Sequence, residues 1–228
     1  MSSSNITICI PCYKYHIPHL KRCLDSIQNQ TVIPHEVIIS CSSSTDLDVQ
    51  SHISTEKYKF LVKFIITDQR KNAAENRNIT ASFAETEFLS FFDADDVMHP
   101  QRIEATIEAI EKFPKTEIIL HSYYTPDESI SLQDWPVIKT FTFIENSLAK
   151  APSGCAIFLP NWQARIHHSQ VAVSKRLWNL IQFNESKDHE RKEDAVFCGN
   201  CLAVSGIQSV YIADKLSKYF EEGATHTV

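Results

Sequence analysis

A chain of 228 residues, 43% hydrophobic and 22% charged, has the composition of a soluble globular protein that can bury a sizeable core. Its 4 glycines lack the spacing of a P-loop or of a GxGxxG dinucleotide motif, which excludes both of these phosphate-binding loops. The formal net charge of −6 argues against a nucleic-acid-binding protein. Since no apolar run approaches the roughly 18 residues of a membrane span, we expect a cytoplasmic protein without a span or a secretory signal.

The first half of the chain alternates predicted strands and helices. Strands are expected at residues 5–11, 35–40, 60–67, 87–92 and 117–121, and helices at 19–29, 73–83 and 101–113. Unbroken apolar strands separated by helices indicate an α/β fold, in which helices flank a mainly parallel central sheet. Ligands of such sheets bind at the carboxyl ends of the strands, here residues 12–15, 41–44, 68–71 and 93–96.

The second half is less regular. Residues 125–133 are polar and predict a loop, short strands are expected at 140–143, 156–159 and 168–173, and helices at 176–183 and 195–204. No low-complexity linker or internal repeat separates the halves. We therefore expect one domain over residues 1–228, with a first half at 1–121 and a second half at 122–228.

Seven cysteines are present, an odd number that favours free thiols in a protein without an export signal. Two pairs, Cys9–Cys12 and Cys198–Cys201, have the CxxC spacing. Strand alternation places positions 9 and 12 on opposite faces, which does not suit one shared metal ion. Buried structural thiols are therefore preferred over a metal site.

The most informative feature is the acidic turn Asp93-Ala94-Asp95-Asp96, which follows a predicted buried strand. Three carboxylates within four residues repel one another unless a cation neutralises them. Oxygen ligands suit Mg²⁺ or Mn²⁺, which leave coordination positions for phosphate and water. The alternative is a plain acidic turn in which Asp96 caps the following helix. The position at the ligand-binding edge of the sheet favours a site for a metal and a diphosphate.

Other polar residues are less informative alone. Arg77 lies on a predicted helix and, taken in isolation, is typical of a solvated helix face. Glu193 and Asp194 open another predicted helix, where carboxylates are common for structural reasons. A carboxylate that faced a metal–diphosphate site could nevertheless deprotonate a hydroxyl. The adjacent His167 and His168 are interpreted as structural residues.

Four motifs resemble, in the same order, those of the inverting nucleotide-sugar glycosyltransferases of family 2. They are the strand Ile8-Cys9-Ile10-Pro11-Cys12-Tyr13-Lys14 with the helix and strand that follow it, Ala74-Glu75-Asn76-Arg77-Asn78 (the family's ARN helix), Phe92-Asp93-Ala94-Asp95-Asp96 (its DXD motif) and Lys192-Glu193-Asp194-Ala195-Val196-Phe197 (its ED helix). The resemblance is strong over residues 5–113 and weaker over 168–201. It implies a single GT-A-type (Rossmann-like) domain, with a nucleotide-sugar-binding half at 1–121 and an acceptor half at 122–228.

The resemblance also implies roles for individual residues. The donor would be bound by Pro11, Tyr13, Cys41, Ser42, Arg77, Asp93, Ala94 and Asp95. The divalent metal, Mn²⁺ or Mg²⁺, would be held by Asp95, with Asp93 and His226 as further ligands. The catalytic base would be Asp194, with Glu193 as the alternative. The implied partners are a UDP- or GDP-sugar and a carbohydrate or glycoconjugate acceptor.

One segment departs from the family pattern. Where the family has an acidic DDGS stretch that recognises the base, this chain has Ser40-Cys41-Ser42-Ser43-Ser44. The family's QxxRW motif of processive members is not matched either, so the resemblance implies addition of a single sugar. Two alternative functions stay open, a sugar-phosphate nucleotidylyltransferase and a carbohydrate-binding domain that has lost turnover.

Overall fold

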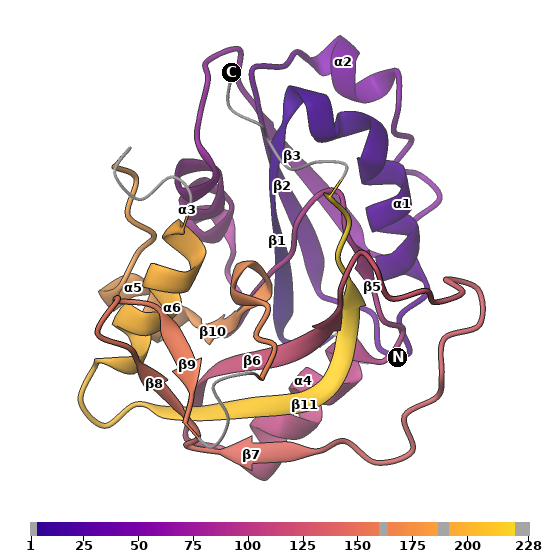
Figure 1. Cartoon of the computed structure of the whole chain (residues 1–228). Coiled ribbons are helices and arrows are strands. Elements are labelled where there is room, and N and C mark those ends of the chain that lie inside the picture. The colour runs from indigo at the N-terminus through magenta and orange to yellow at the C-terminus, as the bar shows by residue number, and fades with distance from the viewer. Residues whose placement is uncertain (1–3, 160–163, 187–191, 222–228) are drawn as a thin grey trace.

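Helices lie on both faces of a central sheet in the computed structural model, which describes residues 4–159, 164–186 and 192–221 (Figure 1). The strands are β1 (Ile6–Tyr13), β2 (Glu36–Ser42), β3 (Leu61–Ile66), β4 (Phe88–Phe91), β5 (Val97–Met98), β6 (Thr116–Tyr124), β7 (Phe143–Glu145), β8 (Leu148–Lys150), β9 (Ala156–Phe158), β10 (Ala172–Ser174) and β11 (Gln208–Lys218). The helices are α1 (Ile17–Gln28), α2 (Asp46–Gln50), α3 (Ala73–Phe83), α4 (Arg102–Lys112), α5 (Lys175–Leu180) and α6 (Glu193–Leu202). No helix in these ranges has the length and apolarity of a membrane span.

The strands of the main sheet follow the order β3-β2-β1-β4-β10-β6-β11-β5, and β7 pairs with β11. Neighbours from β3 to β4 are parallel, and β11 is parallel to β6. β10 lies antiparallel between β4 and β6, with Ala172 opposite both Ser90 and Ile119. The expected α/β fold with a mainly parallel sheet is therefore confirmed, and β10 is the antiparallel strand at its centre.

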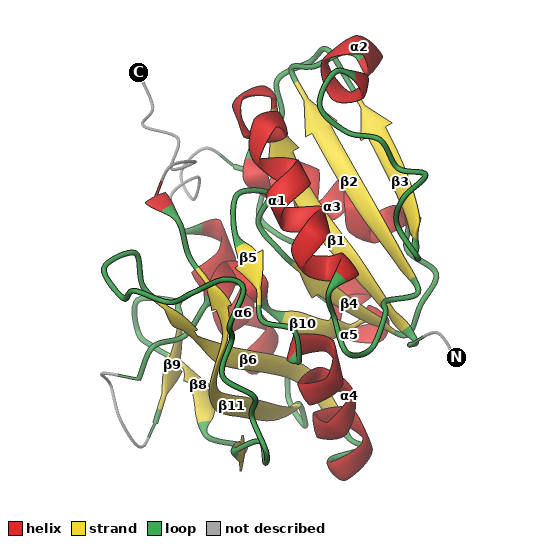
Figure 2. Cartoon of the chain, turned by 90° about the vertical axis from the view of Figure 1, so that its right-hand side faces the viewer, coloured by secondary structure: helices red, strands yellow, loops and turns green. Residues whose placement is uncertain are grey.

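Alternation along the strands sends side chains into two apolar clusters. On one face, the even-numbered residues of β1 from Ile6 to Cys12 pack against α1 and Ile103 of α4. On the other face, Cys9 packs with residues of α3, α5 and α6. Figure 2 shows α1 and α3 on opposite sides of β1 and β2. Cys9 and Cys12 thus lie on opposite faces, and all seven cysteines are free thiols.

A capping box fixes the start of α3. The Asn72 side chain accepts a hydrogen bond from the Glu75 amide, and the Glu75 carboxylate accepts one from the Asn72 amide, at 2.9 and 2.8 Å. The helix spans residues 73–83, as the sequence predicts. This start sets which face of α3 presents Arg77 to the acidic turn.

Close packing against the turn between β8 and β9 fixes the position of α6. A Cβ atom on Gly199 would lie 2.0 Å from the carbonyl oxygen of Gly154, so only glycine allows this approach. The helix carries Glu193 and Asp194 at its first turn.

Several elements differ from the sequence-based expectations. β11 is not predicted, because its pairing with β6 shifts register between Ile212 and Lys215 and the apolar alternation breaks there. The strand expected at 168–173 is a 3₁₀ turn, His168–Gln170, followed by β10. The helix expected at 176–183 already ends at Leu180.

Candidate active site

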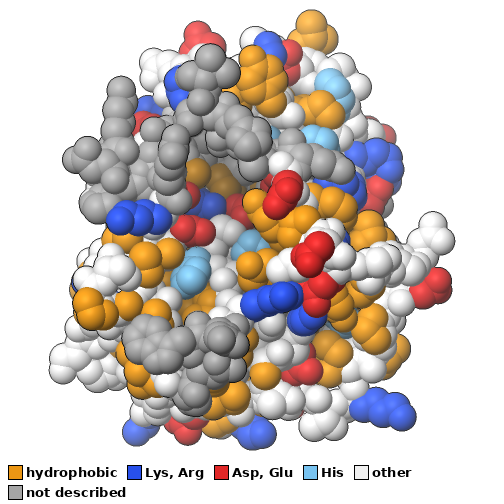
Figure 3. All heavy atoms as spheres, in the orientation of Figure 1, with side chains coloured by type: hydrophobic (Ala, Val, Ile, Leu, Met, Phe, Trp, Pro, Cys, Tyr) orange, Lys and Arg blue, Asp and Glu red, His pale blue; other side chains and the backbone are white. Residues whose placement is uncertain are grey.

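Polar side chains from distant segments meet at the carboxyl end of β4. Because β10 is antiparallel to β4, the segment that precedes β10, residues 167–170, reaches the acidic turn. Because β11 is parallel to β6, its carboxyl end at Lys218 approaches the same edge. Figure 3 shows acidic, basic and histidine side chains around a depression near the middle of the face in view.

The carboxylate of Asp93 is held on both oxygens. Arg77 donates from Nη2 to Oδ1 at 3.0 Å, and the Ser169 hydroxyl donates to Oδ2 at 2.5 Å. The side chain of Asp93 is 20% exposed. Its orientation is therefore determined by α3 on one side and by the segment before β10 on the other.

Asp96 is fully buried and is held by the segment before β10 and by the segment after β11. Its carboxylate accepts hydrogen bonds from Gln170 Nε2 at 2.5 Å and from the Phe220 amide at 2.9 Å. His167 Nε2 lies 3.3 Å from the same carboxylate. Burial, and then the charge of Asp93, raise the pKa of Asp96 well above its usual value. The alternative in which Asp96 caps the next helix is wrong, since the N-cap of α4 is Gln101.

Asp95 differs from its two neighbours. It is 8% exposed, and no other described side chain donates a hydrogen bond to its carboxylate. Burial, and then the charges of Asp96 and Asp93, raise its pKa to about 7. The backbone of the turn is fixed instead, because Arg22 donates to the Asp95 carbonyl at 2.5 Å and stacks 3.9 Å from the Phe220 ring centroid.

A divalent cation fits this carboxylate. Asp95 is a buried oxygen ligand to which no described side chain donates a hydrogen bond, and a cation would remove the electrostatic cost of ionising it. Among the described residues, no three His, Cys, Asp or Glu side chains converge into a complete metal site. The described residues alone would leave most ligand positions of a cation at Asp95 to phosphate oxygens and water, which is how Mg²⁺ is commonly bound.

Arg77 joins the acidic turn to α6. It is 4% exposed, so the solvated helix face that its sequence position suggests is wrong. Its Nη1 donates to Glu193 Oε1 at 2.5 Å, while Nη2 holds Asp93. Burial lowers the pKa of Arg77, but the charges of Asp93 and Glu193 outweigh that effect and raise it.

The two acidic residues of α6 have different surroundings. Glu193 is 7% exposed and paired with Arg77, and burial raises its pKa. The Asp194 carboxylate accepts a hydrogen bond from the Ala195 amide at 2.6 Å and pairs with no cation of the described residues. Among the described residues, Asp194 is thus the acid of this helix turn whose carboxylate forms no ion pair.

The residues expected to bind the donor lie at the ends of β1 and β2. The side chains of Pro11, Cys41 and Ala94 are buried, so these residues present mainly backbone to this edge. The Ser42 hydroxyl accepts a hydrogen bond from Asn76 at 3.0 Å. Tyr13 is half-buried and packs edge-on against Tyr15, with ring centroids 5.4 Å apart. His226 lies outside the described residues.

The serine stretch after β2 is tied to its neighbours. Asn76 also accepts a hydrogen bond from the Ser40 hydroxyl at 2.8 Å. Ser43 has a positive φ of 53°, and its amide donates to the Gln69 carbonyl at 3.0 Å. Among the described residues, nothing hydrogen-bonds to the buried hydroxyl of Ser44. The stretch is therefore an ordered loop that contains no carboxylate.

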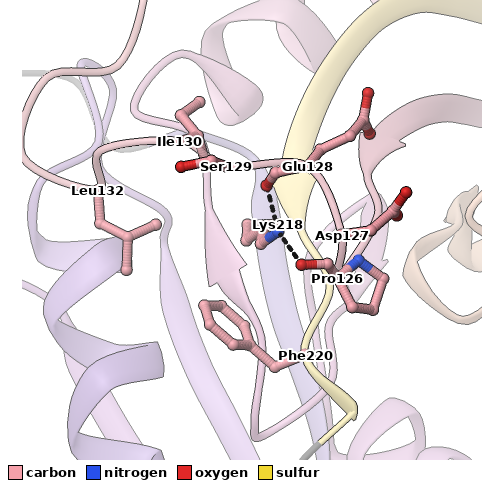
Figure 4. A pocket seen from close by; sticks show the side chains of 8 residues that line it. All are labelled: Pro126, Asp127, Glu128, Ser129, Ile130, Leu132, Lys218 and Phe220. Carbon is pink, nitrogen blue, oxygen red and sulfur yellow. Dashed lines mark hydrogen bonds between the residues drawn. The ribbon is translucent and has the colours of Figure 1, made fainter.

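An open pocket of about 330 Å³ lies beside the acidic turn (Figure 4). One wall is the loop from Pro126 to Leu132, and the other is formed by Lys218 and Phe220. The Lys218 ammonium donates to the carbonyls of Pro126 and Glu128 at 3.1 and 2.6 Å and so fixes the shape of the loop. Phe220 lines the pocket with its ring while its amide holds Asp96.

Sequence reasoning misses five residues of this region: Arg22, His167, Ser169, Gln170 and Phe220. His167 is interpreted as structural from sequence, yet it lies against Asp96 and Ser169. Arg22 lies on α1, while the other four reach the turn only through the pairing of β10 and β11. No local pattern in the sequence could have identified them.

Comparisons with known proteins agree with the fold. The sequence model of a family described as "Glycosyl transferase family 2" matches residues 7–205. An uncharacterized glycosyltransferase of Haemophilus influenzae is 31% identical over 118 residues, which are 51% of this chain and 38% of that protein. The chain thus spans well under half the length of that relative.

Solved structures share the fold at low sequence identity. S. aureus TarS 1–349 in complex with UDP-GlcNAc superposes with a TM-score of 0.72 at 18% identity, over 98% of this chain and 61% of that one. The mannosyltransferase PcManGT from Pyrobaculum calidifontis, in complex with GDP-Man and Mn²⁺, gives 0.67 at 17% identity, over 98% and 59%.

Proposed function

The chain belongs to glycosyltransferase family 2, and from this premise we propose that it transfers one sugar from a nucleoside-diphosphate donor to an acceptor hydroxyl, with inversion. The expected GT-A-type fold is confirmed by the solved structures that it resembles. The observation that carries the proposal is the Asp95 carboxylate, which is buried, accepts no hydrogen bond from another described side chain, and lies at the sheet edge where such folds bind ligands.

Asp95 would hold Mn²⁺ or Mg²⁺ together with the donor diphosphate. A bound divalent cation supplies Lewis-acid stabilisation of the negative charge that develops on the leaving diphosphate. This explains how a chain without a glycine-rich phosphate loop can bind a diphosphate. The Mn²⁺ and GDP-Man bound to the similar PcManGT support the proposal. That Asp93 contacts the ribose or the metal stays a prediction.

The nucleoside would lie over the ends of β1 and β2. The half-buried Tyr13 and the loop after Ser42 border this position. Base recognition would rest on hydroxyl and backbone groups, since the stretch from Ser40 to Ser44 has no carboxylate where the family has an acidic stretch. Complexes of similar proteins with UDP-GlcNAc and GDP-Man support a nucleotide-sugar donor.

Asp194 would be the general base. It would take the proton of the acceptor hydroxyl as that oxygen attacks the anomeric carbon from the face opposite the diphosphate. Glu193 is less suited, because Arg77 holds its carboxylate and neutralises its charge. Arg77 would then act as a link that orients α6 against the acidic turn.

The acceptor would enter through the pocket between the loop 126–132 and Phe220. Its lining combines apolar Ile130 and Leu132 with polar Asp127 and Ser129, a mixture that suits a sugar ring. The pocket adjoins the acidic turn through the Phe220 amide. This placement agrees with residues 1–121 as the donor half and 122–228 as the acceptor half, and a cytoplasmic location stays a prediction.

The test is a panel of nucleotide sugars in a thermal-shift assay with and without MnCl₂, followed by product analysis with the donor that binds. We expect one donor to raise the melting temperature in the presence of Mn²⁺ and to release a nucleoside diphosphate. Release of pyrophosphate would indicate a nucleotidylyltransferase. Binding without turnover for any acceptor would indicate a carbohydrate-binding domain.

A further inference from the structure

Ser169 links the acidic turn to His167 by hydrogen bonds. It is 8% exposed and lies in the 3₁₀ turn that leads into β10. Its hydroxyl donates to Asp93 Oδ2 at 2.5 Å and lies 3.1 Å from His167 Nδ1. The backbone of the segment is anchored as well, since the His167 amide donates to the His121 carbonyl at 3.1 Å.

The direction of these hydrogen bonds follows from the groups involved. An ionised carboxylate only accepts hydrogen bonds, so the single proton of the Ser169 hydroxyl points to Asp93. In the tautomer that carries the ring proton on Nδ1, His167 donates to the hydroxyl oxygen. The serine is thereby oriented by a buried histidine, and it cannot turn away from Asp93 without leaving both groups unsatisfied.

Ser169 completes a chain of contacts that runs from the sheet to α6. Asp93 uses Oδ2 for Ser169 and Oδ1 for Arg77, and Arg77 in turn holds Glu193, the neighbour of Asp194. Removal of the serine would free one oxygen of Asp93 and loosen the carboxylate that anchors Arg77.

We propose that Ser169 is a positioning residue for the transfer reaction, whose hydroxyl holds Asp93 so that Asp95 and Asp194 face the same bound donor. The proposal rests on the proposed function. Ser169 touches neither donor nor acceptor in this role and acts through Asp93 and Arg77. We therefore expect the transfer reaction to require a hydroxyl at position 169. The acidic turn and α6 alone do not indicate this requirement.

The test compares Ser169→Ala with Ser169→Thr and uses Ser217→Ala as the matched control. Ser217 is fully buried in β11, and its hydroxyl has no hydrogen-bond partner among the described residues. Its replacement therefore changes a buried serine without touching the contacts of Asp93. Transfer rates are measured at varied concentrations of Mn²⁺ and of the donor identified in the thermal-shift panel. We expect Ser169→Ala to lower kcat about 10–100-fold, the effect of one lost hydrogen bond to a charged group, and to raise the Mn²⁺ concentration for half-maximal rate.

Threonine, which keeps the hydroxyl, should restore most of the rate, and the control should keep wild-type kcat. Wild-type kcat and Mn²⁺ dependence in folded Ser169→Ala would overturn the proposal. A crystal structure of Ser169→Ala gives a readout without turnover: the Asp93 carboxylate should rotate away from its present position, and an unmoved carboxylate would overturn the proposal. Inactivity of the wild-type chain with every donor would count against the proposed function alone.

Discussion

Replacement of Asp95 by asparagine should stabilise the metal-free protein at pH 8 while it removes the metal site. Burial raises the pKa of Asp95 from 3.8 to about 7. At about 1.4 kcal/mol per pH unit, ionisation of this carboxylate costs the folded state about 4 kcal/mol at pH 8. An asparagine amide at the same place would lack a partner and cost about 1–3 kcal/mol. The expected net stabilisation is about 1–3 kcal/mol.

The pH dependence follows from the direction of the pKa shift. Between pH 3.8 and about 7 the folded state binds more protons at Asp95 than the unfolded state does, so the stability of the wild type falls as the pH rises. The stability of Asp95→Asn should not fall in this way, because asparagine does not ionise. Its advantage over the wild type should therefore be about 2–3 kcal/mol larger at pH 8 than at pH 5.

Urea denaturation in EDTA at pH 5 and pH 8 measures this difference. The control is Asp134→Asn, which removes an exposed carboxylate of the polar loop and should change stability by less than about 0.5 kcal/mol. Mn²⁺ with the donor should stabilise the wild type and leave Asp95→Asn unchanged. An Asp95→Asn protein that is equally destabilised at both pH values would refute the reasoning.

The other predictions concern the link to α6 and the base. Arg77→Met should lower the free energy of unfolding by about 3–5 kcal/mol, because it leaves the carboxylates of Asp93 and Glu193 without their partner. Replacement of the exposed Arg70 by methionine should have little effect. Urea denaturation measures both variants. Gly199→Ala should cost at least about 3 kcal/mol, since its Cβ meets backbone, whereas Gly206→Ala, in open space with a φ of 78°, should cost about 1–2 kcal/mol; equal costs would contradict the packing argument. Asp194→Asn should keep donor affinity in calorimetry and reduce kcat about 100–10,000-fold, and wild-type turnover would exclude it as the base.

The parts of the fold that the sequence predicts are those that depend on neighbouring residues. The capping box of α3 involves only Asn72 and Glu75, and α3 starts where the pattern places it. The strands that end at Tyr13 and just before the acidic turn are rich in apolar residues and buried along their length, so the position of the turn follows from the sequence.

The parts that the sequence does not predict depend on distant pairing. The partners of Arg77 lie 16 and 116 residues away, and so its burial is invisible to a helical pattern. Ser169 reaches Asp93 only because β10 inserts antiparallel between β4 and β6. The strand β11 escapes detection because a register shift interrupts its alternation.

The most direct test of the central claim is a crystal structure with Mn²⁺ and the donor that binds, with data recorded at the manganese absorption edge. The account predicts an anomalous peak in direct contact with a carboxylate oxygen of Asp95 and with oxygens of the donor diphosphate. A bound diphosphate whose manganese lies away from Asp95, or which binds with no manganese, would contradict it.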